Sequence, residues 1–132
     1  MKRKCRRIIS SHDGRRAIYI DEANCDEILA FIHKDERHQK KFRHITDIIL
    51  GGHKNRELYD KEDVNERCKE VTAMKLFKGQ ENARIYCKEM TNQNGTRVVI
   101  AAVLHSRKKS RKNSRVEISI INKVGGYEYE ID

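Results

Sequence analysis

The sequence contains no proline and no tryptophan, and only 6% of its residues are aromatic. Glycine and asparagine must therefore make the turns, and the hydrophobic core must be largely aliphatic. No apolar run approaches the roughly 20 residues that a membrane-spanning helix needs. No apolar segment follows the basic N-terminus, which argues against a secretory signal. We therefore expect a cytoplasmic protein that makes no contact with membranes.

The sequence also lacks the usual motifs for metal and cofactor binding. No Cys-x-x-Cys pair occurs among Cys5, Cys25, Cys68 and Cys87, so we predict reduced thiols in place of disulfides or zinc ligands. The histidines at 33, 38 and 44 are five and six residues apart, whereas ligands on one helix face are three or four apart. No glycine-rich phosphate loop or nucleophile elbow is present. We predict neither a metal nor another cofactor.

Positive charge is abundant and unevenly distributed. The formal net charge is +9 and the sequence pI is about 9.5. Residues 2–16 carry seven Lys/Arg against one Asp, and residues 107–115 carry six Lys/Arg and no acid. Such clusters favour a polyanionic partner, because neutralising phosphates releases counterions; the alternative is a generally soluble basic protein. The length fits a single domain over 1–132, with 1–16 as a basic extension that can form a strand.

In the first half, turn and cap residues separate short apolar segments. Asp13-Gly14 between β-branched runs predicts a hairpin of residues 7–10 and 17–20. Asn24 followed by Glu27 resembles a capping box and predicts a first helix. Asp35 can cap a second helix that ends at Gly51-Gly52. We expect these segments to form a helical hairpin or one bent helix, followed by a long loop over 53–67.

In the second half, the hydrophobic period changes to two. Strands are predicted over 71–78, 84–87 and 97–104, and Asn94-Gly95 marks a hairpin turn. The almost wholly apolar segment 97–104 is typical of a central strand that is buried on both faces. Ser114 with Glu117 predicts a last helix that ends at Gly125-Gly126, then a terminal strand or tail. A β-hairpin over this last region is the alternative.

Short motifs in the second half resemble those of a known toxin family. They are Met74-Lys-Leu-Phe-Lys-Gly79, Ala83-Arg-Ile-Tyr86, and Val99-Ile-Ala-Ala-Val-Leu-His-Ser-Arg-Lys-Lys109 followed by Arg111-Lys-Asn113. With the order of elements, they resemble the RelE/ParE superfamily, and within it the HigB-type and phage-derived branch. The resemblance implies an α+β fold in which an antiparallel sheet of about four strands packs on an N-terminal helical hairpin, with a short C-terminal helix.

The same resemblance implies a function. It points to the toxin of a type II toxin–antitoxin system, a metal-independent and ribosome-dependent endoribonuclease (an mRNA interferase) that inhibits translation. Its partners would be mRNA in the ribosomal A site and a small antitoxin, expected to be a helix-turn-helix DNA-binding protein. By motif position, the basic residues of the family correspond to Lys75 and Lys78 before the turn, to Arg84 after it, and to His105 with 107–109 at the tip of the last strand.

Cleavage of RNA without a metal needs a base, a cation beside the phosphorane and an acid. His105 can carry the proton, because histidine exchanges protons near neutrality, and Arg84 can clamp phosphate oxygens. Lys75 and Lys78 lie on opposite faces of an ideal strand, so one of them, with Lys75 favoured, would reach the phosphate. The positive charges of Arg84 and Lys108 would disfavour the charged form of a nearby lysine, which could then act as a base.

The predicted catalytic set is therefore His105, Arg84, Lys75, Lys78 and Lys108, and the predicted RNA-binding set is Arg107, Lys109, Arg111, Lys112 and Tyr86. A basic segment attached to an apolar strand is suited to gripping the RNA backbone, and a tyrosine can stack on bases. Two alternatives remain. One is a ParE-like toxin that inhibits gyrase without nuclease activity, and the other is a non-catalytic basic nucleic-acid-binding domain.

Overall fold

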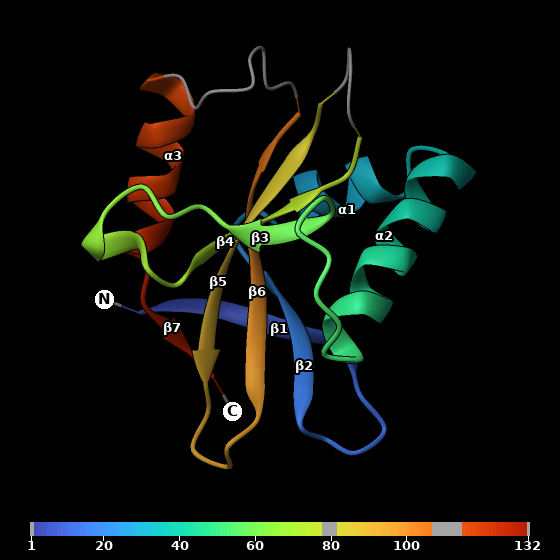
Figure 1. Cartoon of the computed structure of the whole chain (residues 1–132), viewed down its shortest axis with the longest axis horizontal. Coiled ribbons are helices and arrows are strands. Elements are labelled where there is room, and N and C mark those ends of the chain that lie inside the picture. The colour runs from blue at the N-terminus through green and yellow to red at the C-terminus, as the bar shows by residue number, and fades with distance from the viewer. Residues whose placement is uncertain (1, 78–81, 107–114, 132) are drawn as a thin grey trace.

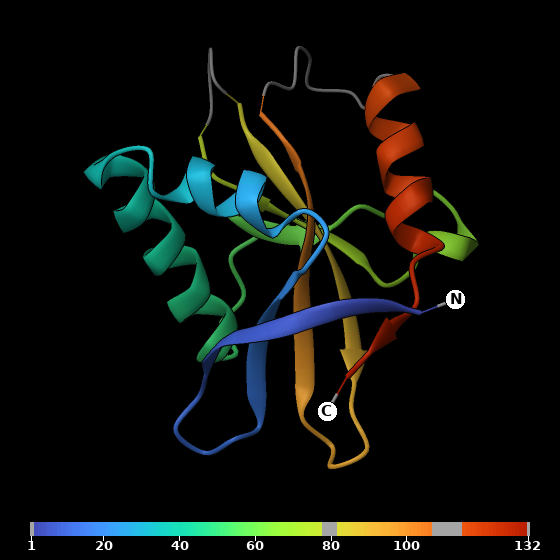
Figure 2. The ribbon, with the colours of Figure 1, turned by 180° about the vertical axis from the view of Figure 1, so that it is seen from behind.

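In the computed structural model, which describes residues 2–77, 82–106 and 115–131, helices cover both faces of one curled, mixed sheet (Figures 1 and 2). In chain order the elements of these ranges are β1 (Arg3–Ser10), β2 (Arg16–Asp21), α1 (Cys25–Ile32), α2 (Glu36–Leu50), β3 (Tyr59–Lys61), the 3-10 helix η1 (Glu66–Cys68), β4 (Val71–Lys75), β5 (Arg84–Thr91), β6 (Arg97–His105), α3 (Arg115–Gly125) and β7 (Tyr129–Glu130). The strand order is β3-β4-β5-β6-β2-β1-β7.

The α+β class and the short C-terminal helix are confirmed, but the predicted place of the helical hairpin and the predicted sheet are wrong. Two strands precede the helices, so the helical hairpin is not N-terminal. The sheet has seven strands among the described residues and is mixed, because β2 pairs in parallel with β6 and β1 in parallel with β7. Strand β1 lies wholly within the basic extension 1–16, and the expected loop over 53–67 contains β3 and the start of η1. None of the helices in the described ranges is long and apolar enough to cross a membrane.

The two faces of the sheet carry separate hydrophobic clusters. Helices α1 and α2 cover one face, with Ile28 and Ile45 against Ile18 and Ile20 of β2. Helix α3 covers the other face (Figure 2), where Ile121 belongs to a second buried cluster. Strand β6 contributes alternate residues to both clusters, so the predicted central strand buried on both faces is confirmed.

Local turn and cap signals were mostly reliable. The Asp13-Gly14 and Asn94-Gly95 turns connect paired strands and place both glycines at positive φ, of 71° and 83°. Asp35 caps α2 by accepting a hydrogen bond from the His38 amide at 2.8 Å. Asn24 lies at the N-cap of α1 but makes no side-chain cap bond. Its amide instead donates to the carbonyl of Ala102 in β6 at 2.8 Å, tying α1 to the sheet.

Strand β6 contains a bulge beside β5. Tyr86 is opposite Val103, whereas the next residue of β5, Cys87, is opposite Ala101. Ala102 is therefore the extra residue of the bulge, and its carbonyl accepts the Asn24 hydrogen bond. Beyond it the alternation changes phase, since Ala102 and Val103 both contribute to the α3 side and Leu104 packs on the α1/α2 side.

Asp21 joins both ends of the chain to the sheet. Its fully buried carboxylate accepts hydrogen bonds from Arg3 in β1, at 2.7 and 3.1 Å, and from the Tyr129 hydroxyl in β7 at 2.6 Å. It also accepts from the amides of residues 23 and 24. Burial by itself would raise the pKa of Asp21, but the bonds from Arg3 and Tyr129 outweigh burial and hold the pKa below its usual value.

Lys88 fixes the C-terminal end of α3 on the sheet. Its ammonium donates to the carbonyls of Gly125 at 2.9 Å and Tyr127 at 2.5 Å, and the residue is 9% exposed. The carbonyls at a helix C-terminus lack intrahelical partners and carry partial negative charge. A buried cation from β5 therefore satisfies this helix end.

Replacing Lys88 with methionine should lower the free energy of unfolding by about 2–3 kcal/mol, because two carbonyls lose a charged donor. Urea denaturation measures the difference, with Lys123→Met on the exposed face of α3 as the control. Equal stability of the two variants would contradict this role for Lys88.

Candidate functional site

Three of the predicted site residues form one row across three neighbouring strands. Lys75, the last residue of β4, is opposite Arg84, the first residue of β5, and Arg84 is opposite His105, the last residue of β6. These partners are distant in sequence, and the antiparallel pairing brings them together. The structure thus juxtaposes Lys75, Arg84 and His105 at one end of the β4-β5-β6 part of the sheet.

The bulge in β6 decides which face His105 occupies. In an uninterrupted strand, His105 would share a face with Val99 and Ala101, toward α1 and α2. The extra residue Ala102 reverses this phase, so His105 lies on the α3 side. There its Nε2 is 3.8 Å from Oε2 of Glu117 in α3, within ion-pair range.

An arginine–glutamate ion pair lies in the same row. Arg84 Nη1 donates to Oε1 of Glu62, which follows β3, at 2.6 Å. The side chains of Arg84 and Glu62 are 14% and 5% exposed, and those of His105 and Glu117 are 19% and 3% exposed. Both carboxylates are thus shielded by the protein, and His105 retains the largest opening to solvent of the four. We refer to Glu62, Arg84, Tyr86, His105 and Glu117 as the polar cluster.

Tyr86 lies behind the ion pairs and is fully buried. Burial raises the pKa of its hydroxyl, and the negative charge of Glu62 raises it further, while Arg84 opposes this and Glu117 adds to it. The phenol therefore remains neutral. Among the described residues, neither this hydroxyl nor Nε of Arg84 has a hydrogen-bond partner, although both atoms are buried. Native proteins leave few such groups, and they often mark a functional site.

The other predicted residues take different positions. Lys75 is the outer member of the row, and its ammonium donates to the carbonyl of Arg56 at 3.0 Å. The buried ring of Tyr86 offers no face for stacking on a base in this structure. Arg84 already uses Nη1 on Glu62, so it does not present a free guanidinium fork. Lys78, Arg107, Lys108, Lys109, Arg111 and Lys112 lie outside the described residues.

Sequence reasoning missed the two carboxylates. The sequence predicts Glu117 as the partner of Ser114 in a capping box; Ser114 lies outside the described residues, and Glu117 is buried and faces His105. The sequence does contain a signal that Glu117 is buried. Glu117 is spaced from Ile121 and Val124, the other buried residues of α3, so that its carboxylate lies on the apolar face of the helix. Glu62 follows a three-residue strand in a polar segment, and no sequence pattern distinguished it.

The polar cluster combines an imidazole beside a carboxylate with a buried cation and a neutral phenol. A carboxylate beside a histidine orients the ring and stabilises the imidazolium that forms when it takes a proton. This set is suited to proton transfer at a bound polar group. Within 2–77, 82–106 and 115–131, no three His, Cys, Asp or Glu side chains gather where they could hold a metal ion.

Comparisons with known proteins give no relative for this chain. No protein-family model, curated protein or solved structure matches it. The resemblance to the RelE/ParE superfamily therefore remains a prediction that rests on the short motifs.

Proposed function

We propose that the protein is a metal-independent endoribonuclease whose chemistry is carried by the polar cluster. The observation that supports this is the pairing of His105 with the buried Glu117 in the same row as Arg84 and Lys75. A histidine and a lysine ammonium at one end of the sheet can supply the base, the cation and the acid that cleavage at a phosphodiester requires.

In this proposal, His105 takes the proton of the ribose 2′-hydroxyl as its oxygen attacks the adjacent phosphorus. The imidazolium that results is stabilised by Glu117. Lys75 supplies positive charge to the phosphorane and a proton to the departing 5′-oxygen. The bond from phosphorus to the 5′-oxygen breaks, leaving a 2′,3′-cyclic phosphate and a 5′-hydroxyl. Arg84 is a positioning residue, because its contact with Glu62 fixes the centre of the row.

The family resemblance extends the proposal to substrate and partner. The RNA would be mRNA in the ribosomal A site, and a small helix-turn-helix antitoxin would neutralise the toxin. An acidic antitoxin segment that folds over a basic surface fits the net charge of +9.

Replacing His105 with glutamine should reduce cleavage by about 10²–10⁴-fold, the usual contribution of a general base. Purified full-length protein is added to a translation reaction programmed with a defined message, and cuts are mapped by primer extension. The control is His44→Gln, since His44 is an exposed residue of α2. Thermal unfolding of each variant separates loss of chemistry from loss of fold.

Each result has a distinct meaning. Cuts at codon boundaries that disappear only in the His105 variant support the proposal, and cuts that persist in it remove His105 from the mechanism. If no cuts appear, the protein is next induced in cells. Growth arrest without cuts then favours the gyrase inhibitor, and the absence of both favours the non-catalytic nucleic-acid-binding domain. The burial of Arg84 and Glu117 agrees with that last alternative, because neither side chain is open to a substrate.

A further inference from the structure

A basic cleft lies on the face of the sheet opposite the polar cluster. It has a volume of about 540 Å³ and is bounded by the end of α2, the loop that follows it, and the strands from β3 to β2. Its floor contains Ile49 and Val99 beside Tyr59 and Thr72. This size lies within the range of small-ligand sites, which is roughly 300–1,000 Å³.

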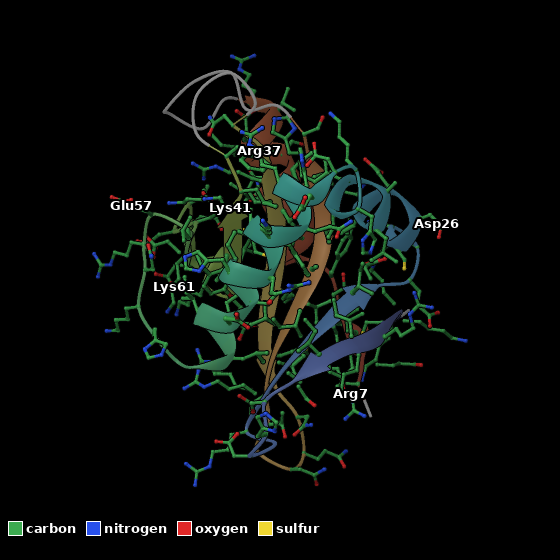
Figure 3. All side chains as sticks on the ribbon, turned by 90° about the vertical axis from the view of Figure 1, so that its right-hand side faces the viewer. Arg7, Asp26, Arg37, Lys41, Glu57 and Lys61 are labelled. Carbon is green, nitrogen blue, oxygen red and sulfur yellow. The ribbon has the colours of Figure 1, made fainter. Side chains whose placement is uncertain are left out.

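The charge of the cleft is predominantly positive. The lining contains cations from the strands and from the loop, but only two acids. The cations are Arg16, Lys54, Arg56, Lys61 and Arg97, and the acids are Asp60 and Glu89. Figure 3 places Lys61 on one side of α2 and Arg7 of β1 on the other. The cleft is therefore distinct from the basic surface of β1. Its net charge favours an anionic ligand.

Two arginines lie side by side in this cleft. Arg16 and Arg97 are partners in the parallel pairing of β2 with β6, and both line the cleft. The guanidinium of Arg16 packs against Gly52, where an added Cβ would lie 2.9 Å from Nη2 of Arg16. Gly52 also has φ of +70°, which disfavours any other residue. The glycine thus leaves the space that the Arg16 guanidinium occupies.

Arg97 is held by a chain of hydrogen bonds that begins at the surface and runs into the sheet. Its Nη2 donates to Oε1 of Glu89 at 3.1 Å, and Oε2 of Glu89 accepts from the Tyr59 hydroxyl at 2.5 Å. The Thr72 hydroxyl donates to Tyr59 at 2.8 Å. Burial, together with the charge of Glu89, raises the pKa of Tyr59, so it stays a neutral donor. The Arg97 side chain is nevertheless 55% exposed, which leaves guanidinium donors open to a ligand.

We propose that this cleft binds a phosphate group of a nucleotide, with Arg16 and Arg97 as the phosphate ligands. Guanidinium groups recognise phosphate oxygens through paired, charge-assisted hydrogen bonds. Ile49 and Val99 also line the cleft, but they are 6% and 3% exposed and add only a small apolar surface. The phosphate can belong to a free nucleotide or to an RNA strand. The proposal does not depend on RNA cleavage.

Calorimetric titration of the full-length protein with AMP tests the site. We expect binding that weakens as salt rises, and about a tenfold or greater loss of affinity in Arg16→Gln and in Arg97→Gln. Arg15→Gln is the matched control, because Arg15 is 85% exposed and pairs with Asp13 outside the cleft. A similar loss in all three variants would attribute binding to net charge and overturn the proposal, as would the absence of AMP binding.

A second pair of variants tests geometry without changing charge. Gly52→Ala should displace the Arg16 guanidinium and weaken AMP binding, whereas Gly14→Ala has the same positive φ, with nothing within 4 Å of its added Cβ. Equal affinities of the two would contradict the role of Arg16. A 2′-O-methyl oligoribonucleotide, which lacks the hydroxyl needed for cleavage, then identifies the source. Competition with AMP supports an RNA strand, and its absence supports a free nucleotide in the same site.

Discussion

Replacement of Asp21 by alanine is expected to lower the free energy of unfolding by about 3–4 kcal/mol. The substitution removes the acceptor for Arg3, for the Tyr129 hydroxyl and for two backbone amides. Removing one partner of a buried, hydrogen-bonded ion pair leaves the others without compensation, which costs more than the pair contributes net. Because Arg3 and Tyr129 come from the first and last strands, both ends of the chain should detach more easily.

Urea denaturation measures this difference, and Glu22→Ala is the control because Glu22 is an exposed acid beside Asp21. The control should change stability by less than about 0.5 kcal/mol. The pKa of Asp21 is depressed in the folded state, so its ionisation stabilises the fold above the usual carboxyl pKa of about 4. This contribution is lost as pH falls through the depressed value. The difference between wild type and Asp21→Asn should therefore shrink in acid, and a constant difference would refute the assignment.

Replacement of Arg84 by methionine is the second large effect that we expect, again about 3–4 kcal/mol. The change leaves the carboxylate of Glu62, 5% exposed, without its partner at 2.6 Å. The apolar double variant Arg84→Met/Glu62→Leu should be more stable than Arg84→Met alone, since no buried charge is left uncompensated.

Chemical denaturation of wild type, both single variants and the double variant gives the coupling energy of the pair. A matched cycle with Arg97→Met and Glu89→Leu tests an ion pair whose arginine is 55% exposed, and it should give a smaller coupling. Additive effects in the Arg84–Glu62 cycle would show that the two side chains act independently. In that case Arg84 could not fix the centre of the row by holding Glu62.

Features that depend on a few neighbouring residues were predictable from the sequence. The hairpins at Asp13-Gly14 and Asn94-Gly95, the cap at Asp35 and the end of α2 near Gly51 follow from local backbone preferences. The same hairpin register, continued without interruption, would place Leu104 opposite Arg84, and only the bulge at Ala102 brings His105 there.

Features that depend on distant pairing were not predictable. The parallel pairing of β2 with β6 leaves no turn signal, since the strands are far apart in sequence. Strand β3 has only three residues, and its polar sequence gives no alternation to detect. Glu117 and Glu62 reach His105 and Arg84 only because the tertiary fold packs α3 and β3 on the sheet.

The bulge in β6 makes local backbone conformation, as well as residue type, a determinant of which side chains meet at the polar cluster. Ala102 could be exchanged for another small residue, and His105 would still face Glu117. If the bulge straightened with every residue retained, Leu104 would instead face Glu117 and His105 would face the aliphatic core. Loss of Ala102 together with the bulge would leave both residues on their present faces. The backbone conformation of β6 therefore sets the side of the sheet on which His105 lies.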